Sequence, residues 1–543
     1  MASLEQRLQS QKFDYLETRA ALRGERLPTA LGHAITRLCV IRGIRYHESF
    51  ATNDASILFG CPGHPEFTRA LNARAIMSDR IPDLDPASRP EEVPYCIWHP
   101  EVASEETYRQ LARRYPSMKY QVARACAVAG YTDLYLELDI LPEVSVAEEA
   151  RDARSDAIFA HIMAQPVRYA VMDDYYRVIK TSEASKPAYL NGDTAVCSML
   201  QKRQRFRKPT GVEDDEDDLF GGLIDDKGYD EMIFNITEDQ SLDESEVEIS
   251  TDPMLELLYS PLPLDLPAGN KDLLILMAAY YGDIDRYVRL RRPTMIPKEN
   301  FCVVRGIYHN SLFAKRWSTQ QNPPAEDQPF YMHNWDHIQA AITARHIMNN
   351  DLSRIANNRA IPSSQLPYLI WFPNVARPET YRTLANLRPE MREACIRAAI
   401  YANYEKLFDE LLPDTSPNAF LVAEARQSPN PKYLTALEAR AKELDVDITP
   451  SATLSGRGHW AWKMFSVKQT GPSMRSENGV PTAVDEETIG GEWEQDAVYN
   501  GMRCSANMLE LFLMLPEEWR PKDMYVELDY EDWPPQEFLG GKA

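Results

Sequence analysis

Residues 94–118 read PYCIWHPEVASEETYRQLARRYPSM, and residues 367–391 read PYLIWFPNVARPETYRTLANLRPEM. The two stretches align without a gap at an offset of 273, and 15 of their 25 positions are identical. Further upstream, residues 39–44 (CVIRGI) pair with residues 302–307 (CVVRGI). Internal similarity of this kind indicates that one structural unit occurs twice in the chain.

Both copies predict helices. Residues 122–130 read VARACAVAG, in which small residues allow close helix contact and Gly130 is typical of a helix end. The aligned second copy has Asn403 where the helix-ending glycine is expected. No series of alternating β-branched residues predicts a large sheet. We therefore expect an all-α fold.

A third stretch carries a family resemblance. Residues 273–290 read LLILMAAYYGDIDRYVRL and resemble an ankyrin repeat, with the small pair Ala278-Ala279 and the helix-ending Gly282, although the Thr-Pro-Leu-His opening of the family is absent. The surrounding Arg-Gly-Ile-Tyr-His and Pro-Tyr-x-Ile-Trp blocks resemble those of fungal ankyrin-repeat-type proteins, some of which are transcription co-regulators. The resemblance implies stacked helix pairs, a solenoid, that bind other proteins. The alternative is an irregular helical domain without a particular ligand.

These patterns predict five regions. We expect an N-terminal helix in 1–24, an ankyrin-like helical lobe in 25–165, a linker in 166–269, a homologous second lobe in 270–447 and an aromatic, acidic capping region in 448–543.

Charge is concentrated in the expected linker. The chain has 59 Lys and Arg against 82 Asp and Glu, a net charge of −23. Between Glu213 and Glu256 there are 18 acidic residues and one basic residue, a net charge of −17, which leaves −6 for the rest.

This acidic segment is predicted to be disordered when free. It contains apolar clusters flanked by carboxylates, a pattern typical of activation segments, and these are candidate partner-binding residues: Leu219, Phe220, Leu223, Ile224, Met232, Ile233 and Phe234. The alternative is a solvating linker.

A basic run precedes the acidic segment. It is a candidate nuclear-import signal and consists of Lys202, Arg203, Arg205, Arg207 and Lys208. It could instead contact nucleic acid or pair with the acidic segment of the same chain. Because the whole chain is acidic, we expect no direct binding to nucleic acid.

The N-terminus predicts no secretory signal, and no apolar stretch is long enough for a membrane span. The expected location is the nucleus, or alternatively the cytoplasm.

Catalytic and metal-binding patterns are weak. His333 and His337 are four residues apart, the spacing of a metal-binding pair, but no third ligand accompanies them. Cys96 and His99 are near one another, yet the second copy has Leu369 and Phe372 there, which favours packing. The eight scattered cysteines predict buried, reduced thiols. We expect no enzyme activity, no cofactor and no metal.

Three hypotheses follow. The first is a nuclear ankyrin-repeat co-regulator that acts through a partner transcription factor or regulatory machinery, for example on fungal secondary-metabolite genes. The second is a cytosolic ankyrin-type scaffold without a role in transcription. The third is a metal-dependent enzyme on a helical-repeat frame.

Overall fold

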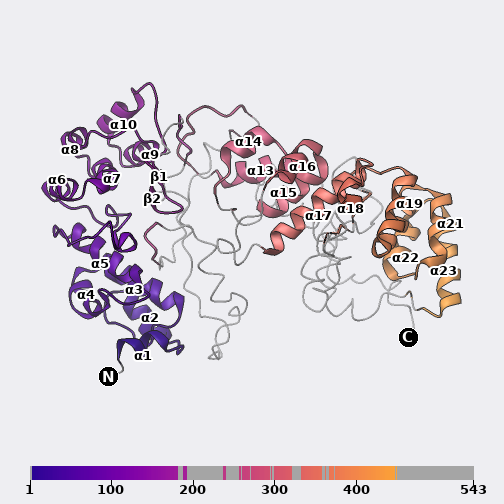
Figure 1. The fold of residues 1–543 in the computed structure, drawn as a ribbon, viewed down its shortest axis with the longest axis horizontal. Helices are drawn as coiled ribbons and strands as arrows, with labels where there is room; N and C mark the ends of the chain where they lie inside the picture. The colour runs from indigo at the N-terminus through magenta and orange to yellow at the C-terminus, as the bar shows by residue number, and fades with distance from the viewer. Residues whose placement is uncertain are drawn as a thin grey trace, which may run out of the picture. The chain divides into compact units, whose positions relative to one another are not determined.

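The structure is a computed structural model of the 543-residue chain, and most of its described residues are helical, in agreement with the predicted all-α class. The described residues are 3–181, 187–192, 236–239, 256–257, 260–269, 271–293, 295, 299–320, 332–357, 361, 366–367, 369–371, 373–446 and 448. The chain divides into two compact units, Met1–Lys271 and Asp272–Ala543 (Figure 1).

The first unit consists of helices and one small hairpin. Its helices are α1 (Leu4–Gln9), α2 (Tyr15–Leu22), α3 (Ala34–Tyr46), α4 (Glu48–Thr52), α5 (Pro65–Met77), α6 (Glu105–Arg114), α7 (Lys119–Ala129), α8 (Thr132–Glu137), α9 (Val144–Asp152) and α10 (Asp156–Met163). Strands β1 (Met172–Asp173) and β2 (Val178–Ile179) are antiparallel, with Met172 opposite Ile179. Successive helices pack on one another, α2 on α3, α6 on α7 and α9 on α10.

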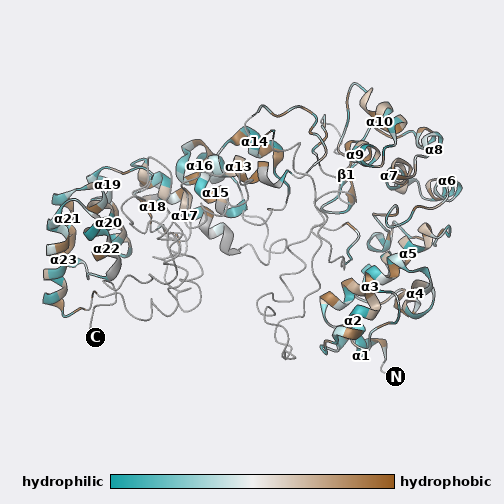
Figure 2. Ribbon diagram, turned by 180° about the vertical axis from the view of Figure 1, so that it is seen from behind, coloured by the Kyte–Doolittle hydropathy of each residue, from teal (hydrophilic) through white to brown (hydrophobic). Residues whose placement is uncertain are grey.

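The second unit is helical in its described part. Its helices are α13 (Asp272–Tyr281), α14 (Ile284–Leu290), α15 (Glu299–His309), α16 (Ser311–Ser318), α17 (Met332–Met348), α18 (Ser353–Asn357), α19 (Pro378–Leu387), α20 (Arg392–Ala402), α21 (Glu405–Leu411), α22 (Ala419–Gln427) and α23 (Pro431–Leu444). Within this unit α13 packs on α15, and α19 and α21 pack on α20. In both units the helices carry hydrophobic and hydrophilic residues together (Figure 2), the pattern of helices that bury one face.

Capping residues set the ends of several helices. Gly130 ends α7 with φ 75°, and Asn403 ends α20 with φ 57°, so both occupy the helix-ending position that the sequence pattern gave them. Glycine has no steric penalty in this left-handed conformation, and asparagine tolerates it better than most other residues. The substitution of Gly130 by Asn403 in the aligned position is therefore conservative for the backbone.

Residues 1–24 contain two helices, whereas the sequence analysis expected one. Ser3 and Gln6 form a capping box at the start of α1. The carboxylate of Asp14 accepts a hydrogen bond from the backbone N–H of Glu17 over 2.9 Å and begins α2. Each cap needs an extended residue before its helix, so one continuous helix is excluded.

A glycine allows two helices of each unit to pack closely. A Cβ atom added to Gly43 of α3 would lie 2.0 Å from the carbonyl oxygen of Ala21 in α2. A Cβ atom added to Gly306 of α15 would lie 2.0 Å from the carbonyl oxygen of Ala279 in α13. Since no side chain fits at either position, close packing explains the glycine of the Arg-Gly-Ile block in both copies.

The described stretches of 166–269 belong to the first unit, whereas we expected a linker there. Val171, Met172, Leu190 and Ile236 are buried in the same hydrophobic core as helices α6 to α10. The guanidinium of Arg151 in α9 also donates a hydrogen bond to the carbonyl oxygen of residue 266 over 2.9 Å. These contacts extend the first unit beyond its expected end at residue 165.

Candidate functional site

Four arginines of the first unit come together around a short acidic stretch of the chain. We call Arg42, Arg45, Arg69 and Arg177 the arginine cluster. Arg42 and Arg45 lie on α3, Arg69 lies on α5, and Arg177 lies in the turn between β1 and β2. Their side chains are 14%, 4%, 21% and 40% exposed, so the cluster extends from the interior to the surface. Guanidinium groups in such surroundings favour carboxylate partners.

Residues 236–239, Ile-Thr-Glu-Asp, supply the carboxylates for this cluster. Glu238 accepts two hydrogen bonds from Arg69, from Nε over 2.8 Å and from Nη2 over 2.6 Å. Its second oxygen lies 3.0 Å from Nε of Arg177. Asp239 lies 3.7 Å from Arg42 and 3.8 Å from Arg45. The stretch thus meets all four arginines through two adjacent carboxylates.

The apolar part of this stretch is buried. Ile236 is 3% exposed and belongs to the hydrophobic core of the first unit, and Thr237 is 4% exposed. Glu238 has φ 58°, a left-handed conformation that is uncommon for a residue with a side chain. The stretch therefore binds by an apolar anchor followed by a turn that directs two acidic side chains to arginines.

Polar groups hold the arginines of α3 in place. The guanidinium of Arg45 donates to the carbonyl oxygen of His99 over 2.5 Å, and the guanidinium of Arg42 lies 3.8 Å from the centre of the Tyr46 ring. The Tyr46 hydroxyl and Nε2 of His99 are 2.8 Å apart. Burial, together with the charge of Arg45, lowers the pKa of His99 to about 4, so the imidazole is neutral at pH 7. Burial raises the pKa of Cys96 to about 11, which favours the neutral thiol and agrees with the predicted packing role.

A buried ion network lies at the base of the hairpin. Arg124 of α7 is fully buried and binds Glu149 of α9 over 2.7 Å. It also binds both oxygens of Asp174, over 2.6 and 3.1 Å, and its guanidinium lies 4.8 Å from the Trp98 ring centre. Burial alone would lower the pKa of Arg124, but the carboxylates of Asp174 and Glu149 raise it above its ordinary value. This network fixes the turn that carries the fourth arginine of the cluster.

Glu143 fastens the same hairpin through backbone groups. Its carboxylate accepts from the N–H of Val146 over 2.8 Å, at the start of α9, and from the N–H groups of Val171 and Met172, each over 3.3 Å. Burial raises the pKa of Glu143 to about 7, although the hydrogen bond from Val146 acts in the opposite direction.

Part of this arrangement recurs in the second unit, where Arg397 and Trp371 align with Arg124 and Trp98. Arg397 is fully buried, binds Glu424 over 3.0 Å and lies 5.1 Å from the Trp371 ring centre. In both units a buried tyrosine hydroxyl donates to a backbone carbonyl eleven residues earlier, over 2.8 Å for Tyr108 and 2.9 Å for Tyr381. The repeated sequence blocks therefore make equivalent contacts.

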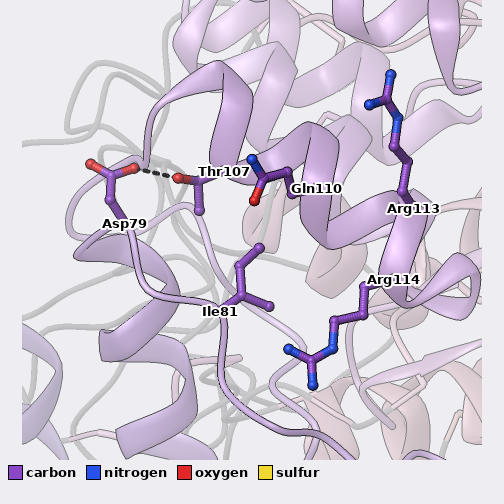
Figure 3. A pocket seen from close by; sticks show the side chains of 6 residues that line it. All are labelled: Asp79, Ile81, Thr107, Gln110, Arg113 and Arg114. Atoms are coloured by element: carbon purple, nitrogen blue, oxygen red, sulfur yellow. Dashed lines mark hydrogen bonds between the residues drawn. The ribbon is translucent and has the colours of Figure 1, made fainter.

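A hollow of about 580 Å³ lies beside α6 (Figure 3) and is lined by Asp79, Ile81, Thr107, Gln110, Arg113 and Arg114. Asp79 accepts from the N–H of Ser104 over 2.8 Å and from the Thr107 hydroxyl over 2.7 Å, and these bonds lower its pKa. The two arginine side chains extend in different directions in Figure 3.

An uncharged residue makes the same contacts in the second unit. Oδ1 of Asn350 accepts from the N–H of Arg377 over 2.7 Å and from the Thr380 hydroxyl over 2.9 Å. Since an amide makes these contacts at the aligned position, they do not depend on the charge of Asp79 and are explained by a capping role at the start of α6.

Most of the residues that the sequence singled out lie outside the described residues. These are the acidic–hydrophobic candidates Leu219, Phe220, Leu223, Ile224, Met232, Ile233 and Phe234, and the basic run Lys202, Arg203, Arg205, Arg207 and Lys208. The same holds for 449–543 of the expected capping region. His333 and His337 belong to α17, but their side chains lie outside the described part.

Metal ligands and membrane-spanning helices can be assessed only among the described residues. Within them, no group of three or more His, Cys, Asp or Glu side chains could hold a metal ion. None of the described helices is long and apolar enough to cross a membrane. Six cysteines are described, all buried and outside disulfides, as predicted: Cys39, Cys61, Cys96, Cys126, Cys302 and Cys395.

Sequence reasoning did not find the arginine cluster. Its members are up to 135 positions apart in the chain, from Arg42 to Arg177, and form no motif. The stretch around Glu238 and Asp239 looked like any other part of the acidic segment. The one local signal was Ile236, an apolar β-branched residue two positions before the acidic pair.

Comparisons with known proteins match small parts of the chain. Residues 98–199 match the family described as YKP1 C-terminal domain. A 50-residue stretch is 34% identical to the uncharacterised killer plasmid pGKl-2 protein 1 of Kluyveromyces lactis, and it covers 9% of this chain and 22% of that protein. No solved structure matches the chain. The family match contains Arg124, Glu149 and Asp174 of the buried network. None of these matches bears on the ankyrin resemblance, which stays a prediction.

Proposed function

We propose that this chain is a protein–protein interaction protein built from two related ankyrin-like helical lobes. In this proposal it acts as a transcription co-regulator through a partner transcription factor. The observation that carries it is the binding of residues 236–239 by arginines that lie far away in the sequence, such as Arg69. A domain that binds a short stretch through an apolar anchor and charged pairs uses the chemistry of peptide recognition. The equivalent contacts of the two units support the related lobes.

The test is a reporter assay with the full chain tethered to a promoter. Deletion of 213–234 removes the acidic–hydrophobic candidates but keeps Ile236, Glu238 and Asp239. We expect this deletion to reduce reporter output at least tenfold. A deletion of 213–256 would also remove the bound stretch, so the shorter deletion is the cleaner variant. Unchanged output would refute activation through this segment.

The scaffold alternative predicts a different result for the basic run. Replacement of Lys202, Arg203, Arg205, Arg207 and Lys208 by glutamine should shift a fluorescent fusion from nucleus to cytoplasm if the run is an import signal. A fusion that is cytoplasmic with and without the replacement would favour the scaffold. Metal analysis of the purified chain tests the enzyme alternative, which needs an ion bound through His333 and His337.

A further inference from the structure

The bound stretch has the properties of a short linear motif. It is four residues long: Ile236 enters the core, Glu238 pairs with Arg69 and Arg177, and Asp239 lies near Arg42 and Arg45. Glu238 and Arg69 are 169 positions apart. The contacts are therefore tertiary, and they depend on a sequence pattern that another protein could also present.

The charge of the site selects its ligand. Each guanidinium of the cluster carries a permanent positive charge, and two of them, Arg45 and Arg42, are 4% and 14% exposed. Arginines gathered at one place repel each other unless an anion lies between them. Carboxylates that accept from Arg69 through two nitrogens satisfy this need with a fixed geometry. An acidic peptide fits the cluster better than a neutral or basic one.

We propose that the arginine cluster is a binding site for acidic peptides of partner proteins, and that residues 236–239 occupy it as an internal competitor. The peptide it takes has an apolar residue followed, two and three positions later, by two carboxylates. This inference rests on the proposed function and specifies the partner. A segment of the same chain has an effective concentration on the order of millimolar, so a partner peptide binds strongly only after the internal stretch is displaced.

The test uses the purified full chain and a fluorescein-labelled peptide of its own residues 230–241, DEMIFNITEDQS. Binding is measured by fluorescence anisotropy in low salt. The released variant combines Ile236→Ala, Glu238→Gln and Asp239→Asn, which remove the anchor and both charges. We expect it to bind the peptide at least tenfold more tightly than the wild-type chain. Equal binding by the two chains would overturn the proposal.

Two further variants show where the peptide binds. In the released chain, Arg69→Gln should weaken peptide binding at least tenfold. Arg114→Gln is the matched control, because Arg114 is half exposed, lies on α6 and is outside the cluster. Equal effects of the two substitutions would place the peptide elsewhere and refute the site. A peptide with glutamine and asparagine in place of its Glu-Asp pair should not bind.

The single variant Glu238→Gln keeps Ile236 and guards against misfolding of the released chain. We expect it to bind the peptide at least threefold more tightly than wild type, and no gain would count against the competitor role. A twelve-nucleotide single strand is the last competitor. If it displaces the peptide at a lower concentration than unlabelled peptide does, the cluster is a nucleic-acid site and the proposal is wrong. Failure of peptide binding together with loss of reporter output on deletion of 213–234 would leave the proposed function intact.

Discussion

Removal of the buried guanidinium at Arg124 should destabilise the first unit strongly. The substitution Arg124→Met keeps most of the apolar volume but leaves the carboxylates of Glu149 and Asp174 without their cation. Glu149 is fully buried and Asp174 is 12% exposed, so water reaches only the second. Loss of one partner of a buried ion pair costs about 3–5 kcal/mol. Because two carboxylates lose the same partner, we expect a value near the upper end, about 5 kcal/mol.

The assay is calorimetry of the full chain. The melting temperature of the first unit should fall by on the order of 10 °C, because a unit of this size loses about 2–4 °C per kcal/mol. The parallel variant is Arg397→Met in the second unit, which removes the cation that binds the buried Glu424 and should lower the melting temperature of that unit instead of the first. A triple variant, Arg124→Met with Glu149→Gln and Asp174→Asn, removes the buried charges and should recover at least half of the loss. The reasoning is refuted if Arg124→Met lowers the free energy of unfolding by less than about 1 kcal/mol. It is also refuted if the triple variant is no more stable than Arg124→Met.

The other predictions concern stability in both units. The pKa of His99 is lowered to about 4, below its unfolded value, so its contribution to stability is present above pH 6.5 and is lost as the pH falls towards 4. Urea titrations should therefore show that wild type loses about 3 kcal/mol more than His99→Phe over this range; parallel pH profiles would contradict this. Gly43→Ala and Gly306→Ala each place a methyl group against a carbonyl oxygen, so each should lower the free energy of unfolding by about 3 kcal/mol or more. The melting temperature of the respective unit shows this loss. Tyr108→Phe and Tyr381→Phe should each cost about 1–3 kcal/mol in urea unfolding, since each leaves a buried carbonyl without its donor, and a cost for only one of them would show that the two contacts are not equivalent.

Local patterns predicted the helices well and the tertiary contacts poorly. The helix ends at Gly130 and Asn403 follow from residues that tolerate positive φ, and the structure has them in that conformation. The two caps at Ser3 and Asp14 also have a sequence signal, since each is followed three residues later by glutamine or glutamate, but we expected a single helix in 1–24. The sequence showed that the Arg-Gly-Ile block is repeated, but it did not show why a glycine is needed there. That reason is the close approach of Gly43 to a carbonyl oxygen of a neighbouring helix.

The candidate site could not be predicted from one sequence. Ile236 belongs to the site because the fold buries it. Glu238 belongs to the site because Arg69, on the distant helix α5, binds it. Hydrophobic periodicity predicts neither contact, because four residues are too few to show a helical or strand repeat and the surrounding sequence is strongly acidic. The charge of −17 in 213–256 describes the segment on average and gives no sign that residues 236–239 contact the fold.

This contact changes how the co-regulator and the scaffold hypotheses are separated. A pure spacer predicts an acidic segment without specific contacts to either unit, and the ion pairs of Glu238 and Asp239 are not explained by a spacer alone. An activation segment needs its apolar clusters accessible, and the bound stretch begins only two residues after Phe234. Release of the stretch and deletion of the clusters are therefore different perturbations. If Glu238→Gln raises reporter output while deletion of 213–234 abolishes it, the first unit restrains the segment. If both changes lower output, the bound stretch itself takes part in activation.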